Sequence, residues 1–214
     1  MNRRSWLVFV LGAISALLLC ALLGGLISGA APSQRQEISR LAELMHWKPG
    51  TILADVGAGD GSYSFAAAEI VGPTGRVYAT EIDTDKLKQI RAEVLKRKLS
   101  NVVVVEGTVD DTKLPMECCD AIYLRHVYHH LTQPEEFDRN LVRSLKPGAR
   151  LAIIDFPANE NLEPVEGVPK NRGGHGIPEK IVVDELTSAG LQVEKVVNDW
   201  SSNDYCVVFV KQGP

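Results

Sequence analysis

The stretch Ala54-Asp55-Val56-Gly57-Ala58-Gly59-Asp60-Gly61 decides the fold of this 214-residue chain. It completes the short apolar run of residues 51–55, which has the character of a buried strand, and it precedes a helical pattern over residues 62–71. The three glycines let the backbone turn sharply and approach a ligand closely, because no Cβ stands in the way. In sheets of this kind ligands bind beyond the carboxyl ends of the strands, so the loop is the first candidate for a binding site.

Predicted strands and helices alternate along the rest of the chain as well. The predicted strands cover residues 51–55, 76–81, 101–106, 120–124, 150–155, 192–197 and 205–210, and the predicted helices start near Ser33 and cover 62–71, 85–98, 132–145 and 178–189. The last two strands are separated by a polar turn instead of a helix, which predicts an antiparallel hairpin. The pattern therefore predicts an α/β fold with a doubly wound, mostly parallel, Rossmann-like sheet of seven strands.

The composition is that of a globular protein, with 45% hydrophobic and 23% charged residues, which excludes disordered and fibrous classes. Residues 32–214 carry a net charge of −6, because only Arg3 and Arg4 are charged before them and the whole chain carries −4. Such a domain matches a phosphate backbone poorly, so nucleic acid is a disfavoured partner. The four cysteines show no C-x-x-C spacing, so we expect apolar fillers rather than a zinc site or a disulfide framework.

Residues 1–31 form a separate segment before the domain of residues 32–214. Residues 6–27 contain no charged side chain, and as a helix they would span roughly 33 Å, enough to cross a bilayer core of about 30 Å. We therefore predict a single-pass N-terminal membrane anchor. A cleaved signal peptide with export is the alternative, because small residues follow at positions 28–31. The membrane side stays open, since basic residues flank the span at both ends.

The glycine loop differs from a dinucleotide-binding loop. The dinucleotide pattern G-x-G-x-x-G requires a third glycine where this chain has Ser62. Asp55 and Asp60 would also repel a pyrophosphate group, whereas they suit a ligand that carries positive charge. A nicotinamide-dependent oxidoreductase is therefore disfavoured.

The loop resembles the first motif of the class I S-adenosylmethionine-dependent methyltransferases, which is an acidic residue followed by G-x-G-x-G. The resemblance extends over residues 38–210. It includes an acidic residue, Glu81, at the end of the second strand, the segment 106–115, and the segment 145–151, which is similar to the family's LKPGG turn. That turn departs from the family at Ala149, which replaces the second glycine. The resemblance implies S-adenosylmethionine as cofactor.

The resemblance also implies roles for particular residues. Asp55 would hold the cofactor's ammonium group, Glu81 would accept both ribose hydroxyls, and Asp110 would contact the adenine. Backbone amides of the glycine loop would face the cofactor's carboxylate. The expected cofactor-binding residues are Asp55, Gly57, Gly59, Gly61, Glu81, Asp110 and Arg125.

The methyl acceptor is expected beside the segment that follows the fourth strand. A protonated acceptor needs a base near neutral pH, and histidine suits that task. His129 and Tyr128 are the first catalytic candidates, and His175 is a further one, on a glycine-flanked loop where similar family members place a histidine. Each histidine could instead cap a helix or bond a backbone carbonyl. No metal-binding spacing links the histidines to Asp155, so no metal is expected.

These expectations combine into one function and one alternative. The segment of residues 156–177 is proline- and glycine-rich without an apolar periodicity, and is interpreted as a lid over the acceptor. We predict a membrane-tethered methyltransferase that acts on a small-molecule or membrane-associated acceptor. The alternative is a membrane-anchored module that binds S-adenosylmethionine without catalysis.

Overall fold

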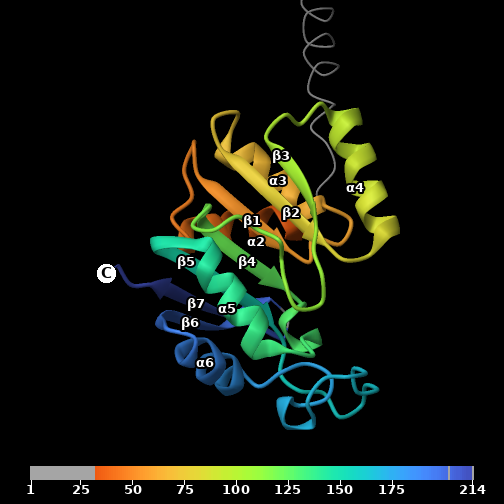
Figure 1. Cartoon of the computed structure of the whole chain (residues 1–214), viewed down its shortest axis with the longest axis vertical. Helices are drawn as coiled ribbons and strands as arrows, with labels where there is room; N and C mark the ends of the chain where they lie inside the picture. Colours follow the sequence, from red (N-terminus) through yellow and green to blue (C-terminus); the bar gives the residue numbers. More distant parts are fainter. Residues whose placement is uncertain (1–31, 202, 214) are drawn as a thin grey trace, which may run out of the picture. The chain divides into compact units, whose positions relative to one another are not determined.

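The computed structural model describes residues 32–201 and 203–213 (Figure 1). The contacts between residues divide the chain into two units, residues 1–31 and residues 32–214. The predicted membrane anchor or signal peptide lies outside the described residues. Within the described residues, no helix combines the length and the apolar character needed to cross a membrane.

Seven strands and five helices of the described chain alternate much as the sequence predicts. The strands are β1 (Ile52–Val56), β2 (Arg76–Glu81), β3 (Val102–Glu106), β4 (Cys119–Arg125), β5 (Leu145–Asp155), β6 (Leu191–Ser201) and β7 (Asp204–Lys211). The helices are α2 (Pro32–Leu44), α3 (Ser62–Val71), α4 (Thr84–Arg97), α5 (Pro134–Ser144) and α6 (Glu179–Ser188), with 3-10 turns η1 (Tyr128–His130) and η2 (Lys170–Arg172).

The strands form one mixed sheet in the order β3-β2-β1-β4-β5-β7-β6. The first five pair in parallel, whereas β7 pairs antiparallel with both β5 and β6. The predicted seven-stranded sheet with an antiparallel C-terminal hairpin is confirmed. The strand order reverses between β1 and β4, and this is the place where open α/β sheets bind their ligands.

Helices cover both faces of the sheet (Figure 1). One core packs α2, α3 and α4 against one face, and a second core packs α5 and α6 against the other. Neighbouring residues of β1 belong to different cores, since Leu53 lies in the first and Ala54 in the second. This explains why β1 is apolar without alternation, as is usual for a strand buried on both faces.

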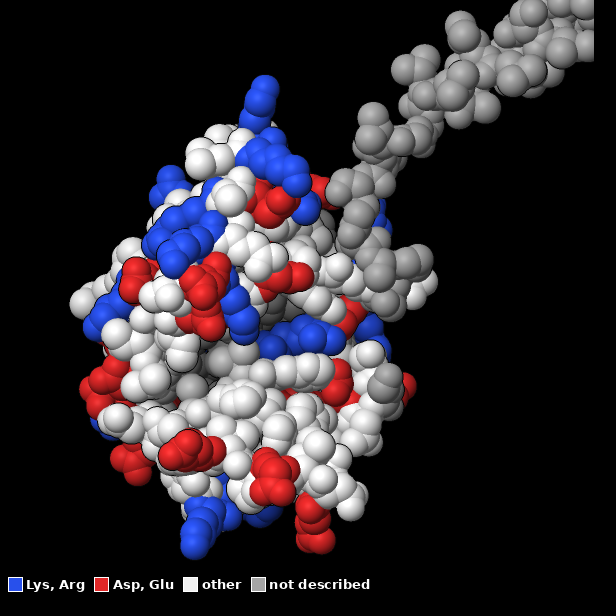
Figure 2. All heavy atoms as spheres, turned by 90° about the vertical axis from the view of Figure 1, so that its right-hand side faces the viewer, with Lys and Arg blue, Asp and Glu red and all other residues white. Residues whose placement is uncertain are grey.

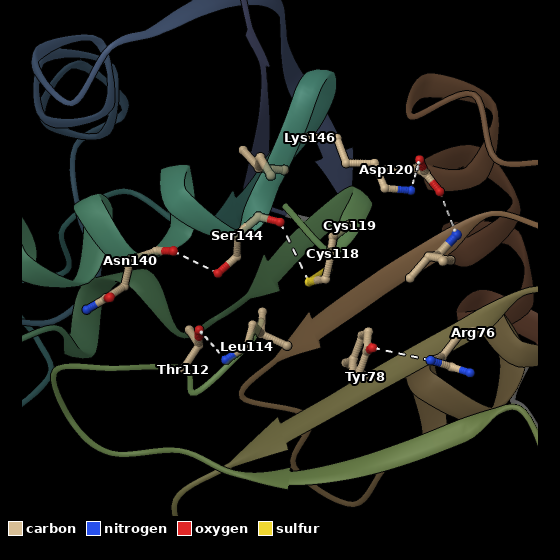
Figure 3. The surroundings of a disulfide bond; sticks show 12 residues. Arg76, Tyr78, Thr112, Leu114, Cys118, Cys119, Asp120, Asn140, Ser144 and Lys146 are labelled. Atoms are coloured by element: carbon tan, nitrogen blue, oxygen red, sulfur yellow. Dashed lines mark hydrogen bonds and ion pairs between the residues drawn. A yellow bond between two sulfur atoms is a disulfide. The ribbon is translucent and has the colours of Figure 1, made fainter. Parts of the chain in front are cut away.

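The expectation that the cysteines are apolar fillers is wrong for Cys118 and Cys119. The adjacent residues Cys118 and Cys119 are joined in a disulfide at the start of β4, while Cys206 is free and buried in β7. Figure 3 shows the surroundings of the bond, where Lys146 donates to Asp120 at 2.7 Å. Adjacent cysteines match no spaced motif, and so the sequence pattern could not reveal this pairing.

Candidate functional site

A cavity of about 450 Å³ lies at the carboxyl ends of β1, β2 and β4. Figure 2 shows the surface hollowed on this side of the molecule, with both basic and acidic side chains around the hollow. The polar and charged residues of its wall are Thr80, Glu81, Asp83, Lys86, Thr108, Thr112, Arg125, His126, His130 and Thr132. The cavity therefore lies at the reversal of strand order, where the sequence predicts the site.

The glycine loop forms the floor of the cavity. Gly57, Gly59 and Gly61 all have φ between +60° and +80°, which only glycine adopts without strain. The loop is held by Thr80, whose carbonyl accepts hydrogen bonds from the Gly57 and Ala58 amides. Gly57 and Gly59 line the cavity, whereas Gly61 is not part of its wall and is the N-cap residue of α3. Two of the three predicted glycines are therefore at the cavity wall.

Glu81 reaches the cavity from the end of β2. Its carboxylate accepts hydrogen bonds from the Gly59 and Ile82 amides at 2.8 Å and from the Asp83 amide at 3.1 Å. These bonds fix the side chain and tie the first loop to the second. The predicted ribose-binding carboxylate thus lies where a ligand in the cavity can reach it.

Asp55 is placed beneath the loop rather than in the cavity wall. It is buried, and its carboxylate accepts a hydrogen bond from the Ser64 hydroxyl at 2.6 Å. Burial raises the pKa of Asp55 to about 6, although the bond from Ser64 acts in the opposite direction. The expected contact of Asp55 with an ammonium group stays a prediction, and the structure adds a contact that holds α3 to β1.

Arg125 lines the cavity and Asp110 lies beside it. Arg125 donates from Nε to Glu37 of α2 at 2.9 Å, and its guanidinium lies over the ring of Tyr63. Thr108 and Thr112 line the cavity on either side of Asp110, which is not itself in the wall. The backbone carbonyl of Asp110 accepts a hydrogen bond from Asn140. The structure therefore brings Arg125, but not the Asp110 side chain, to the cavity.

His129 forms a buried pair with Asp155. Its Nδ1 lies 2.8 Å from Asp155 Oδ1, and its backbone amide donates to Oδ2 at 3.1 Å. The histidine side chain is only 2% exposed, and its other ring nitrogen, Nε2, has no hydrogen-bond partner within the described chain. A buried polar atom without a partner costs free energy, so it marks a place where a ligand group could bind.

Aromatic rings surround this pair. The centroid of the His129 ring lies 4.1 Å from that of His130, 4.8 Å from Phe156 and 5.4 Å from His175. His130 lines the cavity, and burial lowers its pKa, which favours the neutral ring. His175 is held by its Nδ1, which lies 2.8 Å from the Glu163 carbonyl oxygen. The predicted pair His129 and His175 is thus brought together, from η1 and from the loop before α6.

Tyr128 is directed away from the cavity, toward α5. It is fully buried, and its hydroxyl lies 3.0 and 2.9 Å from the two carboxylate oxygens of Asp138. Burial raises the pKa of Asp138 to about 7, although the hydrogen bond from Tyr128 acts in the opposite direction. The structure therefore does not bring this predicted catalytic residue together with the histidines.

We expect Asp138→Asn to stabilise the protein at alkaline pH. The folded-state pKa of about 7 lies above the ordinary aspartate pKa of 3.8, so folding favours the protonated acid and stability falls as pH rises between these values. Between pH 5 and pH 8 the wild type should lose about 3 kcal/mol relative to the variant. Urea unfolding at both pH values measures this, with the exposed Asp184→Asn as control. Equal pH dependence of wild type and Asp138→Asn would contradict the burial argument.

Sequence reasoning missed a second histidine–carboxylate pair, and the histidine of this pair lies in the cavity wall. His126 Nε2 lies 2.9 Å from Asp204 Oδ2, and the His126 backbone has a left-handed φ of 54°. Its Nδ1 lies 3.4 Å from Arg125 Nη1. Asp204 begins β7, 78 residues away, so no spacing in the sequence links the pair. The only available signal was the place of His126 directly after β4.

The residues of the cavity fit S-adenosylmethionine. Gly59 leaves its backbone open for a close approach, because an added Cβ there would meet no other atom within 4 Å. Glu81 offers a fixed carboxylate for hydroxyl groups, and the apolar side chains Ile82 and Val109 line the wall beside it. These residues therefore offer a carboxylate for a sugar and an apolar wall for a flat base.

Comparison with known proteins agrees with this geometry. Residues 54–153 match the family model described as a methyltransferase domain. The ubiquinone/menaquinone biosynthesis C-methyltransferase UbiE of Ectopseudomonas mendocina (strain ymp) is 32% identical over 126 residues, which are 58% of this chain and 49% of that protein. The UbiE of Pseudomonas putida (strain GB-1) is 29% identical over 120 residues, 56% of this chain and 47% of that protein. The chain thus spans about half the length of these relatives.

Solved structures share the fold over most of the chain. A SAM-dependent methyltransferase from Aquifex aeolicus matches with a TM-score of 0.68 and 29% identity, covering 84% of this chain and 93% of that one. The [4+2]-cyclase SpnF matches with a TM-score of 0.69 and 16% identity, covering 84% of this chain and 82% of that one. Because a cyclase shares the fold, the fold alone does not decide the reaction.

Proposed function

We propose that this chain is a class I S-adenosylmethionine-dependent methyltransferase and that it methylates a small aromatic acceptor whose hydroxyl is deprotonated by His129. The observation that carries the proposal is the buried Nε2 of His129, which lacks a partner among the described residues while Asp155 occupies Nδ1. A hydroxyl is the simplest group that would satisfy this atom, and an acidic hydroxyl would give it a proton.

Asp155 makes His129 suited to this role. If Nδ1–H donates to Asp155, the lone pair of the neutral ring lies on Nε2, where a base needs it. The carboxylate also stabilises the imidazolium that forms when Nε2 accepts a proton, as the aspartate of a catalytic triad does. His129 would therefore accept the hydroxyl proton and leave a phenolate ready for methylation.

The cofactor-binding residues have a separate task. When bound, S-adenosylmethionine supplies an electrophilic methyl group on a sulfonium and leaves as the neutral thioether. We assign Gly57, Gly59, Glu81 and Arg125 to its binding, since all four line the cavity. Their contribution is alignment, because an in-line displacement depends on holding the two reacting atoms in position.

The surroundings of His129 favour an aromatic acceptor. Phe156 packs edge-to-face against both His129 and His126, at centroid distances of 4.8 and 5.5 Å. Val127 and Leu131 extend an apolar wall into the cavity. Aromatic rings pack well in such edge-to-face arrangements. The UbiE relatives are named for methylation of carbon in ubiquinone and menaquinone biosynthesis, and this name is consistent with a phenolic acceptor.

The test is a transfer assay on the full chain with methyl-labelled S-adenosylmethionine. We expect label in hydroquinone, catechol or an alkyl-substituted hydroquinone, and none in the corresponding methyl ethers that lack a free hydroxyl. NMR of the product identifies the methylated atom. If S-adenosylhomocysteine binds the protein while no phenol is methylated, the proposal fails and the non-catalytic binding module becomes the better interpretation.

We also propose that residues 1–31 attach the enzyme to a membrane and that the acceptor is membrane-soluble. The support is the uncharged run of residues 6–27. After expression, the full chain should stay with membranes on alkaline extraction and keep its N-terminal mass. Loss of about 31 residues from the mature protein would support a cleaved signal peptide instead.

A further inference from the structure

Arg172 is a buried arginine in the segment of residues 156–177, and it is outside the cavity wall. Its side chain is 2% exposed. Nη1 donates to the Leu131 carbonyl at 2.9 Å, and Nη2 donates to the Tyr128 carbonyl at 3.2 Å. Nε and Nη2 also donate to the two carboxylate oxygens of Glu185 in α6, at 2.8 and 2.9 Å. One guanidinium therefore joins three parts of the fold.

We propose that Arg172 is a positioning residue that fastens the segment 156–177 to the turn carrying His129. Closure of the segment over the acceptor and orientation of His129 are then a single event. This proposal rests on the proposed function, because it assigns His129 the role of base. It does not make Arg172 a catalytic residue, since Arg172 acts through the backbone of η1.

The bonds of Arg172 lie on both sides of His129. Tyr128 precedes the histidine and Leu131 follows it two residues later, so the two bonded carbonyls lie on either side of His129 along the chain. Arginine is suited to this task, because its rigid fork of donors can bond several acceptors at once. A lysine in the same place could reach an acceptor but could not hold both carbonyls and the carboxylate in one geometry.

The same short stretch also contacts the ring of His129. Gly173 and Gly174 follow Arg172 with φ of +105° and +82°, and this glycine turn leads directly to His175. The His175 ring then stacks on His129 at 5.4 Å. The backbone of the His129 turn and the face of its ring are therefore both held by residues 172–175. A shift of this stretch would release both together.

The test compares Arg172→Met and Arg172→Lys with Lys170→Met, an exposed neighbour in the same 3-10 turn. A double variant, Arg172→Met/Glu185→Leu, replaces the ion pair by two apolar side chains, and proteins often tolerate such a replacement of a buried ion pair. We expect this variant to stay folded, and it removes the bonds to Tyr128 and Leu131. Hydrogen exchange of the His129 and His130 amides, binding of S-adenosylhomocysteine and kcat with a phenol are measured on the full chain.

We expect both Met variants to exchange the two histidine amides at least tenfold faster, with unchanged exchange in β1 and β5. Binding of S-adenosylhomocysteine should stay within twofold of wild type, kcat should fall at least thirtyfold, and Arg172→Lys should recover part of kcat. Lys170→Met should match wild type. Unchanged exchange at His129 in the double variant overturns the proposal, even if the wild type is active. If the wild type transfers no methyl group, the proposed function fails. The hydrogen-exchange data then still test the positioning role of Arg172.

Discussion

His129→Gln should lower methyl transfer to a phenol by about a thousandfold and leave binding of S-adenosylhomocysteine unchanged. A positioned general base contributes roughly 10²–10⁴ to a rate, and glutamine cannot accept the hydroxyl proton. Because His129 is not in the wall of the cofactor cavity, its replacement leaves the contacts of the cofactor intact. Initial rates at saturating cofactor and calorimetric titration of the full chain measure the two effects.

Asp155→Asn should reproduce part of this loss. The amide cannot stabilise an imidazolium as a carboxylate does, so we expect the rate to fall about a hundredfold. His46→Gln, at an exposed histidine after α2, is the matched control and should behave as wild type. His126→Gln tests the competing assignment of the base, because His126 lines the cavity and is also paired with a carboxylate, that of Asp204. A thousandfold loss in His126→Gln with an active His129→Gln would place the base at His126 instead.

The sequence predicts the sheet well because burial on both faces leaves a local signal. Continuous apolar runs such as 52–56 are typical of parallel strands, and the polar turn near residue 203 indicates the hairpin. The glycine loop is similarly local, since its left-handed φ values require glycine at fixed positions. These features depend on neighbours in the chain, which a single sequence displays.

The details of the site depend instead on contacts between distant residues. Successive residues of a 3-10 turn point about 120° apart, and so Tyr128, His129 and His130 face three different surroundings. Tyr128 faces Asp138, His129 faces Asp155 and His130 faces the cavity. The sequence shows that three polar rings are adjacent but does not give the phase of the turn. That phase is set by its packing between α5 and β5.

Glu37 illustrates the same limit on the cofactor side. This residue of α2 accepts hydrogen bonds from Arg125 of β4 at 2.9 Å and from Trp200 of β6 at 2.8 Å. Burial alone would raise the pKa of Glu37, but these bonds outweigh it and lower the pKa, so the carboxylate stays charged beside Arg125. The contacts span 88 and 163 residues, and no pattern within α2 predicts them.

Gly57→Ala should weaken binding of S-adenosylhomocysteine at least thirtyfold, whereas Gly148→Ala should leave it unchanged. The two glycines have almost the same left-handed φ, +75° and +76°, so both alanines carry a similar backbone cost of about 1–2 kcal/mol. They differ in the space around them. A Cβ at Gly57 would lie 2.5 Å from Val127 Cγ2, while a Cβ at Gly148 would meet no other atom within 4 Å.

The clash at Gly57 cannot be relieved by a small rotation of Val127, because a β-branched side chain has few accessible rotamers. The loop must move instead, and the loop amides are what we assign to the cofactor. Calorimetry and thermal unfolding of the full chain separate the two consequences. In Gly57→Ala/Val127→Ala the clash is removed, so the melting temperature should recover, while the added methyl group still occupies the cavity floor and the affinity should stay low. Full recovery of affinity in this double variant would mean that the loop position, and not the open backbone at Gly57, is what the cofactor requires.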